Sequence, residues 1–104
     1  MSSRQKHLEE LLKIEPNDPF LRYGLAMEHK KAGRLDQALE WFGKTLEADA
    51  TYCYAWYQQG QVHQARGEVE AARSVYERGI AAARQCNDNH AAGEMQAALD
   101  ELEA

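Results

Sequence analysis

The 104-residue sequence contains only two cysteines and two prolines, and it has no long run of apolar residues. A membrane-spanning helix needs about 18 consecutive apolar residues, so we expect no membrane role. The polar residues 1–7 lack the apolar stretch of a signal peptide, which predicts a cytoplasmic protein. Cys53 and Cys86 form no CxxC pair, which fits reduced thiols in a reducing compartment.

Basic residues are also scarce, because 12 Lys and Arg stand against 17 Asp and Glu, a net charge of -5. Nucleic-acid binding needs clustered cations that neutralise phosphates, and the densest basic group is only Lys30, Lys31 and Arg34. A DNA-binding helix-turn-helix would need a basic recognition helix, whereas the segment from Trp56 to Arg66 contains one cation. We therefore expect no nucleic-acid partner.

The sequence shows no pattern that carries chemistry. His29 and His63 have no ligand partner at i, i+4, so no metal site is predicted. Ser74 lies within a predicted helix without a strained turn, and the glycines form neither GxxxxGK nor GxGxxG. We expect a protein that is not an enzyme and that needs no cofactor.

What the chain does contain is an internal repeat of 34 residues. The residue pairs related by this step are Tyr23 and Tyr57, His29 and His63, Gly33 and Gly67, Ala38 and Ala72, and Phe42 and Tyr76. Self-similarity at this period is typical of helix-turn-helix arrays, in which each unit buries its apolar face by stacking on the next. The pattern favours a binding scaffold without naming its partner.

Apolar periodicity and turn signals predict six helices. The expected segments are one ending near residue 14, then 19–32, a third from residue 35 or 36 to about 49, a fourth ending at 67, then 68 to about 84, and a last helix after 87–89. We expect Asp18 to cap the second helix with Pro19 at its first position, and Thr51 to cap the fourth. Gly33 and Gly67 are predicted to end their helices in the left-handed conformation.

The motif Trp56-x2-Gln59-Gly60-x2-His63, followed by Ala72-x3-Tyr76, resembles the tetratricopeptide repeat pattern. The first unit repeats it as Arg22-x2-Leu25-Ala26-x2-His29 and Ala38-x3-Phe42, after Pro16. This chain departs from the family pattern at several positions. Arg22 stands where the pattern has a large apolar residue, Gln59 where it has leucine, and histidine at two positions where it has tyrosine. Ala50 and Arg84 stand where the pattern has the closing proline. Small residues at the helix crossings keep the hairpin register.

The resemblance implies an all-α fold of antiparallel helix hairpins, stacked as a short right-handed superhelix of about six helices. In that register the single domain 1–104 comprises a half-repeat (1–16), repeat 1 (19–52), repeat 2 (53–86) and a capping helix (87–104). The cap would bury Met95, Ala98, Leu99 and Leu102, and would turn Glu94, Asp100, Glu101 and Glu103 to water.

The family resemblance also implies a concave groove lined by the first helix of each repeat. The groove residues carried onto this chain are Phe20, Tyr23, Met27, Lys30, Tyr54, Tyr57, Gln61 and Gln64. Helical geometry agrees in part, because Phe20, Tyr23 and Met27 cannot share one face with the core-facing residues of their helix. The alternative is that Phe20 and Tyr54 fill helix contacts and that the last helix covers Tyr57.

These patterns predict a non-catalytic scaffold that binds a protein or peptide segment in an aromatic groove. The alternative is self-association, such as a homodimer, through exposed helix faces. Family members that bind the C-terminal carboxylate of heat-shock chaperones use Lys, Asn and Arg side chains for this contact. This chain has Tyr23, Met27, Gln58, Asp88 and Ala92 at those places, so we do not expect heat-shock chaperones as partners. The two cysteines fall at the same end of one predicted hairpin, so both free thiols and a regulatory disulfide stay open.

Overall fold

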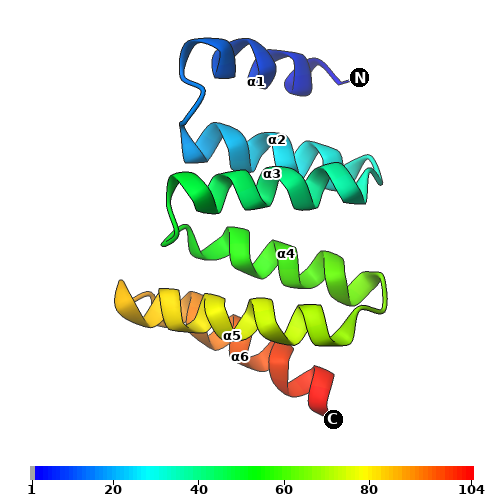
Figure 1. Cartoon of the computed structure of the whole chain (residues 1–104), viewed down its shortest axis with the longest axis vertical. Coiled ribbons are helices and arrows are strands. Elements are labelled where there is room, and N and C mark those ends of the chain that lie inside the picture. The colour runs from blue at the N-terminus through cyan, green and yellow to red at the C-terminus, as the bar shows by residue number, and fades with distance from the viewer. Residues whose placement is uncertain (1) are drawn as a thin grey trace. The chain divides into compact units, whose positions relative to one another are not determined.

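The computed structural model describes residues 2–104 and folds them into six α-helices (Figure 1). The helices are α1 (Ser3–Ile14), α2 (Pro19–Lys31), α3 (Leu35–Ala48), α4 (Cys53–Ala65), α5 (Val69–Gln85) and α6 (Asn89–Glu103). The predicted all-α fold with six helices is therefore confirmed for this part of the chain. Across these residues, none of the helices combines the length and the apolar character that a membrane crossing requires.

The chain divides into two compact units, Met1–Asp49 and Ala50–Ala104. In unit 1, α2 and α3 form a hairpin, and α1 packs on α2. In unit 2, α4 and α5 form the equivalent hairpin, and α6 packs along α5 and touches α4. Each unit thus consists of one hairpin with one additional helix.

The structure confirms one of the two capping residues predicted from the sequence. The Asp18 carboxylate accepts a hydrogen bond from the Leu21 amide at 3.2 Å, with Pro19 as the first helical residue. Asp88 caps α6 in the same way, through the Ala91 amide at 3.0 Å. The prediction for Thr51 is wrong, because α4 has Tyr52 at its N-cap and no side-chain capping bond.

The helix ends at Gly33 and Gly67 are built alike in the two units. Both glycines have positive φ angles, 80° and 75°, as the predicted stops require. Beyond each, the next backbone amide donates back to the carbonyl of His29 or of His63 at 2.9 Å. The repeat period therefore reproduces the turn at the level of single hydrogen bonds.

Those two histidines are linked to the residue after each turn. His29 Nδ1 accepts from Arg34 Nε at 2.9 Å, and His63 Nδ1 lies 2.8 Å from Glu68 Oε1. Arg34 and Glu68 are themselves 34 residues apart, so the contact is conserved between the repeats although the partner's charge is reversed.

Small residues allow the helices of each unit to approach closely. Ala26 and Ala38 in unit 1 and Ala72 in unit 2 have no exposed surface. A methyl group added at Gly60 would overlap the Tyr76 ring, which is itself completely buried. The predicted role of position 60 as a close-approach site is confirmed.

Arg22 stands where the repeat usually has a large apolar residue. It nevertheless makes the same hydrogen bond to the preceding loop that Trp56 makes in unit 2. Trp56 Nε1 donates to the Ala50 carbonyl at 2.9 Å. Arg22 Nε donates at the same distance to the carbonyl of Pro16, 34 residues before Ala50. The guanidinium therefore anchors the preceding loop as the indole does, which explains why this departure leaves the hairpin intact.

Candidate peptide-binding surface

The predicted groove residues of unit 1 lie along α2 with unequal exposure. Phe20 is 64% exposed, whereas Tyr23, Met27 and Lys30 are half-buried. The Tyr23 ring packs against Phe42 of α3, with ring centroids 5.7 Å apart and planes tilted by 57°. Burial lowers the pKa of Lys30. This face of α2 therefore offers one exposed aromatic ring beside three side chains that are half-buried in unit 1.

The predicted groove residues of unit 2 lie along α4, and all are half-buried. The Tyr57 ring contacts Tyr54 edge-on at 6.3 Å and Tyr76 of α5 at 6.4 Å between centroids. The contact with Tyr76 is the repeat equivalent of the Tyr23–Phe42 contact in unit 1. Each of these tyrosines therefore supports its own hairpin with one part of the ring and keeps another part accessible.

Gln61 and Gln64 are both tied to the buried phenol of Tyr76. Gln61 Nε2 donates to Tyr76 Oη at 2.7 Å, and the hydroxyl donates to Gln64 Oε1 at 3.0 Å. Burial raises the pKa of Tyr76, so the phenol keeps its proton and remains a donor. These bonds fix the orientation of both amides along α4.

The C-terminal helix covers part of the α4 face. Tyr54 Oη donates to Glu94 Oε1 of α6 at 3.2 Å. Burial, followed by the nearby Glu94 carboxylate, raises the pKa of Tyr54. Next to this bond lies a hollow of about 280 Å³ between α4 and α6, which we call the α4–α6 hollow. It is lined by Tyr57, Gln61, Glu94, Ala97, Ala98 and Glu101.

One acidic residue of this hollow, Glu94, corrects the sequence-based assignment of α6. Glu94 and Glu101 were expected on its water-facing side with Asp100 and Glu103. Glu94 is instead half-buried, whereas Glu101 is exposed as predicted, and both residues line the hollow. The reason is that α6 packs on α5 and α4 at once, so its flank as well as its apolar stripe meets the protein. Glu94 and Glu101 are seven residues apart, with Ala97 and Ala98 between them, so they lie on the same side of the helix. This spacing was the sequence signal for the hollow.

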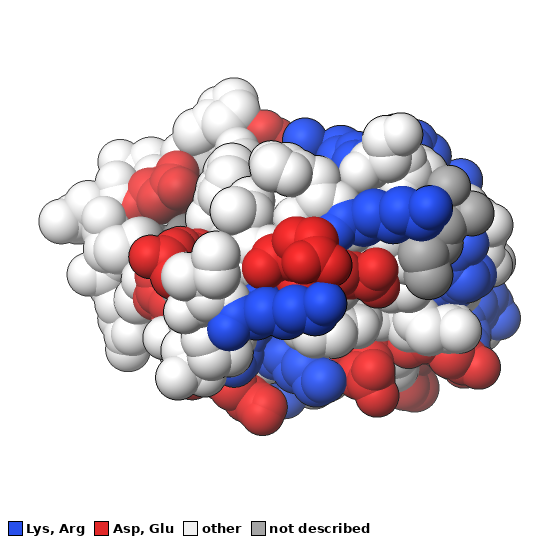
Figure 2. All heavy atoms as spheres, turned by 90° about the horizontal axis from the view of Figure 1, so that it is seen from above, with Lys and Arg blue, Asp and Glu red and all other residues white. Residues whose placement is uncertain are grey.

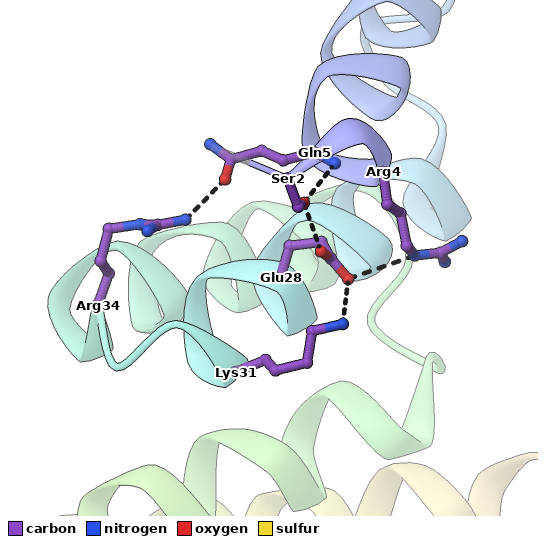
Figure 3. Close-up of polar contacts among 6 residues, drawn as sticks. All are labelled: Ser2, Arg4, Gln5, Glu28, Lys31 and Arg34. Carbon is purple, nitrogen blue, oxygen red and sulfur yellow. Dashed lines mark hydrogen bonds and ion pairs between the residues drawn. The ribbon is translucent and has the colours of Figure 1, made fainter.

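A buried carboxylate in unit 1 was not predicted from the sequence (Figure 3). Glu28 is only 6% exposed, and its Oε1 accepts from Ser2 Oγ at 2.9 Å. Arg4 Nε and Lys31 Nζ both lie 3.4 Å from Oε2. The Ser2 bond, then Lys31 and Arg4, hold the pKa of Glu28 below its ordinary value against the opposing effect of burial. The sequence did contain a signal for this burial, because Glu28 occupies the position in unit 1 that the core residue Val62 occupies in unit 2.

The polar contacts around Glu28 extend to the end of the α2–α3 hairpin. Arg34 Nη2 donates to Gln5 Oε1 at 2.6 Å, and these residues with Ser2, Glu28, Lys31 and Ala32 line a hollow of about 330 Å³. Because Glu28 already has three partners, this network is best explained as the polar link between α1 and α2.

On the surface seen in Figure 2, acidic and basic side chains are interleaved.

Residues 2–104 contain no group of three or more His, Cys, Asp or Glu side chains arranged to hold a metal ion.

Comparison with known proteins identifies the repeat. The tetratricopeptide repeat family model matches residues 54–86. A TPR repeat-containing protein of Pseudomonas aeruginosa is 32% identical over 96 residues, which cover 92% of this chain and 91% of that protein. The chain belongs to the tetratricopeptide repeat family. TPR domains are typically interaction modules without catalytic activity, and this architecture supports a protein-binding role.

Solved TPR structures share the fold. The solution structure of a TPR domain protein from Salinibacter ruber has a TM-score of 0.79 and 33% identity, over 85% of this chain and 89% of that one. The crystal structure of PcrH with the chaperone-binding region of PopD has a TM-score of 0.87 and 20% identity. That match covers 95% of this chain and 75% of PcrH, a protein of Pseudomonas aeruginosa.

Proposed function

We propose that this TPR protein is a non-catalytic scaffold that binds a segment of a partner protein on the first-helix faces of its repeats. The observation that carries the proposal is the α4–α6 hollow, because it combines an open space with aromatic, amide and carboxylate side chains. The exposed Phe20 ring on α2 is a second apolar contact point, in unit 1. PcrH with its bound PopD region supports the idea that this fold accepts a polypeptide segment.

The lining of the hollow favours a basic side chain of the partner. Tyr57 offers a ring on which the stem of a Lys or Arg can lie, and Ala97 and Ala98 leave space beside it. Glu94 and Glu101 supply two carboxylates for the charged end, in a chain whose net charge is -5. We therefore propose a partner segment in which Lys or Arg stands next to apolar residues.

The test is selection of peptides from a random displayed library on the immobilised full-length chain, followed by affinity measurement with fluorescence anisotropy. Selected peptides should be enriched in Lys or Arg beside apolar residues. Glu101→Gln should weaken their binding about three- to tenfold, because it removes one charge while keeping the side-chain shape. The matched control is Asp100→Asn, since Asp100 is exposed on the same helix and does not line the hollow. Equal effects of the two variants would reject the site.

Self-association remains the second candidate, and one observation favours it. Ile14 and Phe20 are 79% and 64% exposed and stand on either side of the α1–α2 turn in unit 1. Two such large apolar side chains near one turn suit burial against a second copy. Sedimentation velocity over a concentration series tests this: a dimer that Phe20→Ser dissociates supports self-association, whereas a monomer at all concentrations removes it.

A further inference from the structure

The only two cysteines of the chain meet at one end of the α4–α5 hairpin. Cys53 is the first residue of α4 and is buried, and Cys86 is the exposed C-cap of α5. Their Sγ atoms are 3.7 Å apart. Since both belong to unit 2, this juxtaposition follows from the packing of one hairpin, and it concerns a feature that the proposed binding function does not use.

The local geometry allows the sulfur atoms to come closer. A disulfide bond is about 2.0 Å long, so the sulfurs must approach each other by less than about 2 Å. Cys86 has left the regular helix, and Asn87 after it takes a left-handed turn with φ of 59°. The remaining contact of Cys86 Sγ is a 3.5 Å bond to the Ala83 carbonyl, which is weak for a thiol donor. Cys86 can therefore move toward Cys53 without unwinding either helix.

We propose that Cys53 and Cys86 are a reversible redox site that forms an intramolecular disulfide between the start of α4 and the end of α5, with small-molecule disulfides such as oxidised glutathione as the oxidant. Two exchange steps balance the reaction. The Cys86 thiolate first attacks one sulfur of oxidised glutathione, which forms a mixed disulfide and releases one glutathione thiolate. The Cys53 thiol then loses its proton to water, and the resulting thiolate attacks Cys86 Sγ, which breaks the mixed disulfide and releases the second glutathione as its thiolate.

The difference in exposure sets the order of these steps. Cys86 is accessible to a small disulfide in solution, whereas Cys53 is shielded and can reach only Cys86. Burial, with smaller contributions from Cys86 and Asp88, raises the pKa of Cys53 to about 12. The closing step is therefore the slower one, and the mixed disulfide on Cys86 should appear first.

The disulfide would hold together the end of the hairpin that carries Tyr54, the residue directly after Cys53. The disulfide would close a loop from Cys53 to Cys86 and so reduce the conformational entropy of the unfolded chain. We therefore expect the melting temperature to rise by roughly 10 °C on oxidation.

The experiment treats the reduced full-length chain with mixtures of reduced and oxidised glutathione and follows the intact mass over time. The expected end product has lost two hydrogen atoms and carries no glutathione, after a transient adduct. Trypsin cleaves after Lys44, Arg66 and Arg84, so the cysteines fall in separate peptides that only the disulfide would join. Dithiothreitol should restore the original mass.

Two variants keep the test specific. Cys53→Ala should stop at one glutathione on Cys86, and Cys86→Ser should stay unmodified because its remaining thiol is buried. A wild-type chain that ends with glutathione on Cys86, or that ends as a disulfide-linked dimer, would overturn the proposal. These readouts need no binding partner, so the redox site and the proposed binding function can fail separately.

Discussion

Arg22 shows how one side chain can replace another of different chemistry at an equivalent position. Its guanidinium donates to the carbonyls of Pro16 and Lys44 and to the side chain of Asn17, at 2.9, 2.6 and 2.7 Å. Trp56 fulfils the first of these roles in unit 2. The repeat pattern records the size and polarity of a residue and not the position of a hydrogen-bond donor, so the sequence alone did not predict this role of Arg22.

Replacing Arg22 by alanine should lower the free energy of unfolding by about 1.5–3 kcal/mol, since backbone carbonyls lose a charged donor. Arg22→Lys is the informative control, because it keeps the charge and loses the planar array of donors, and it should recover only part of the loss. Chemical denaturation measures both. A Lys variant as stable as the wild type would mean that charge, not the hydrogen-bond geometry, is what matters.

Gly60 and Gly93 form a matched pair for testing close packing. A methyl group at Gly60 meets the buried Tyr76 ring, while one at Gly93 meets no atom within 4 Å. Gly60→Ala should therefore destabilise the protein by about 1–3 kcal/mol. Gly93→Ala should stabilise it by roughly 0.5–1 kcal/mol, because alanine is the better helix former. Thermal melting of the two variants gives the comparison, and shifts of the same sign would contradict the packing at position 60.

His29 makes the stability of unit 1 depend on pH. Burial, then the neighbouring Arg34, lowers its pKa from the ordinary value of 6.5, although Glu9 and Glu40 act in the opposite sense. The folded state therefore favours the neutral ring. Its stabilisation is complete above pH 6.5 and is lost as the pH falls through the lowered pKa. Melting temperatures between neutral and acidic pH should fall more for the wild type than for His29→Gln, and parallel curves would refute this assignment.

At the scale of helices, local chemistry determined what could be predicted. Asp18, Gly33 and Gly67 act through bonds to their own neighbours, so their signals are readable in sequence. Thr51 misled because a helix boundary shifted by one residue moves the hydroxyl away from the capping position. The positions of Glu28 and Glu94 depend on which helix lies across from them, and periodicity within one helix does not contain that information.

The docking of α6 on α5 should depend on Met95. This side chain is completely buried, and it lies close to Gly79 of α5. Met95→Ala should cost about 2–5 kcal/mol, as expected for a cavity in a packed core. Gln96→Ala, an exposed position on the same helix, is the control and should be nearly neutral. Hydrogen exchange of the α6 amides would show whether the loss is local, and unchanged protection in the Met95 variant would contradict this packing.

For the whole molecule, the predominance of acidic residues gives the proposed binding a measurable property. The net charge of -5 attracts a basic segment over a distance set by the ionic strength. Raising the salt concentration from about 0.05 M to about 0.5 M should therefore slow association of a selected Lys- or Arg-containing peptide more than it speeds dissociation. Stopped-flow fluorescence separates the two rates.

The charge of the whole chain and the charge of the hollow can be distinguished with two variants of equal net charge. Glu101→Gln and Asp100→Asn each remove one negative charge, so they should reduce the association rate by similar small amounts. Only Glu101 lines the α4–α6 hollow, so only Glu101→Gln should raise the dissociation rate. If dissociation responds equally in both variants, the peptide senses the overall field of the protein and its basic side chain does not occupy the hollow.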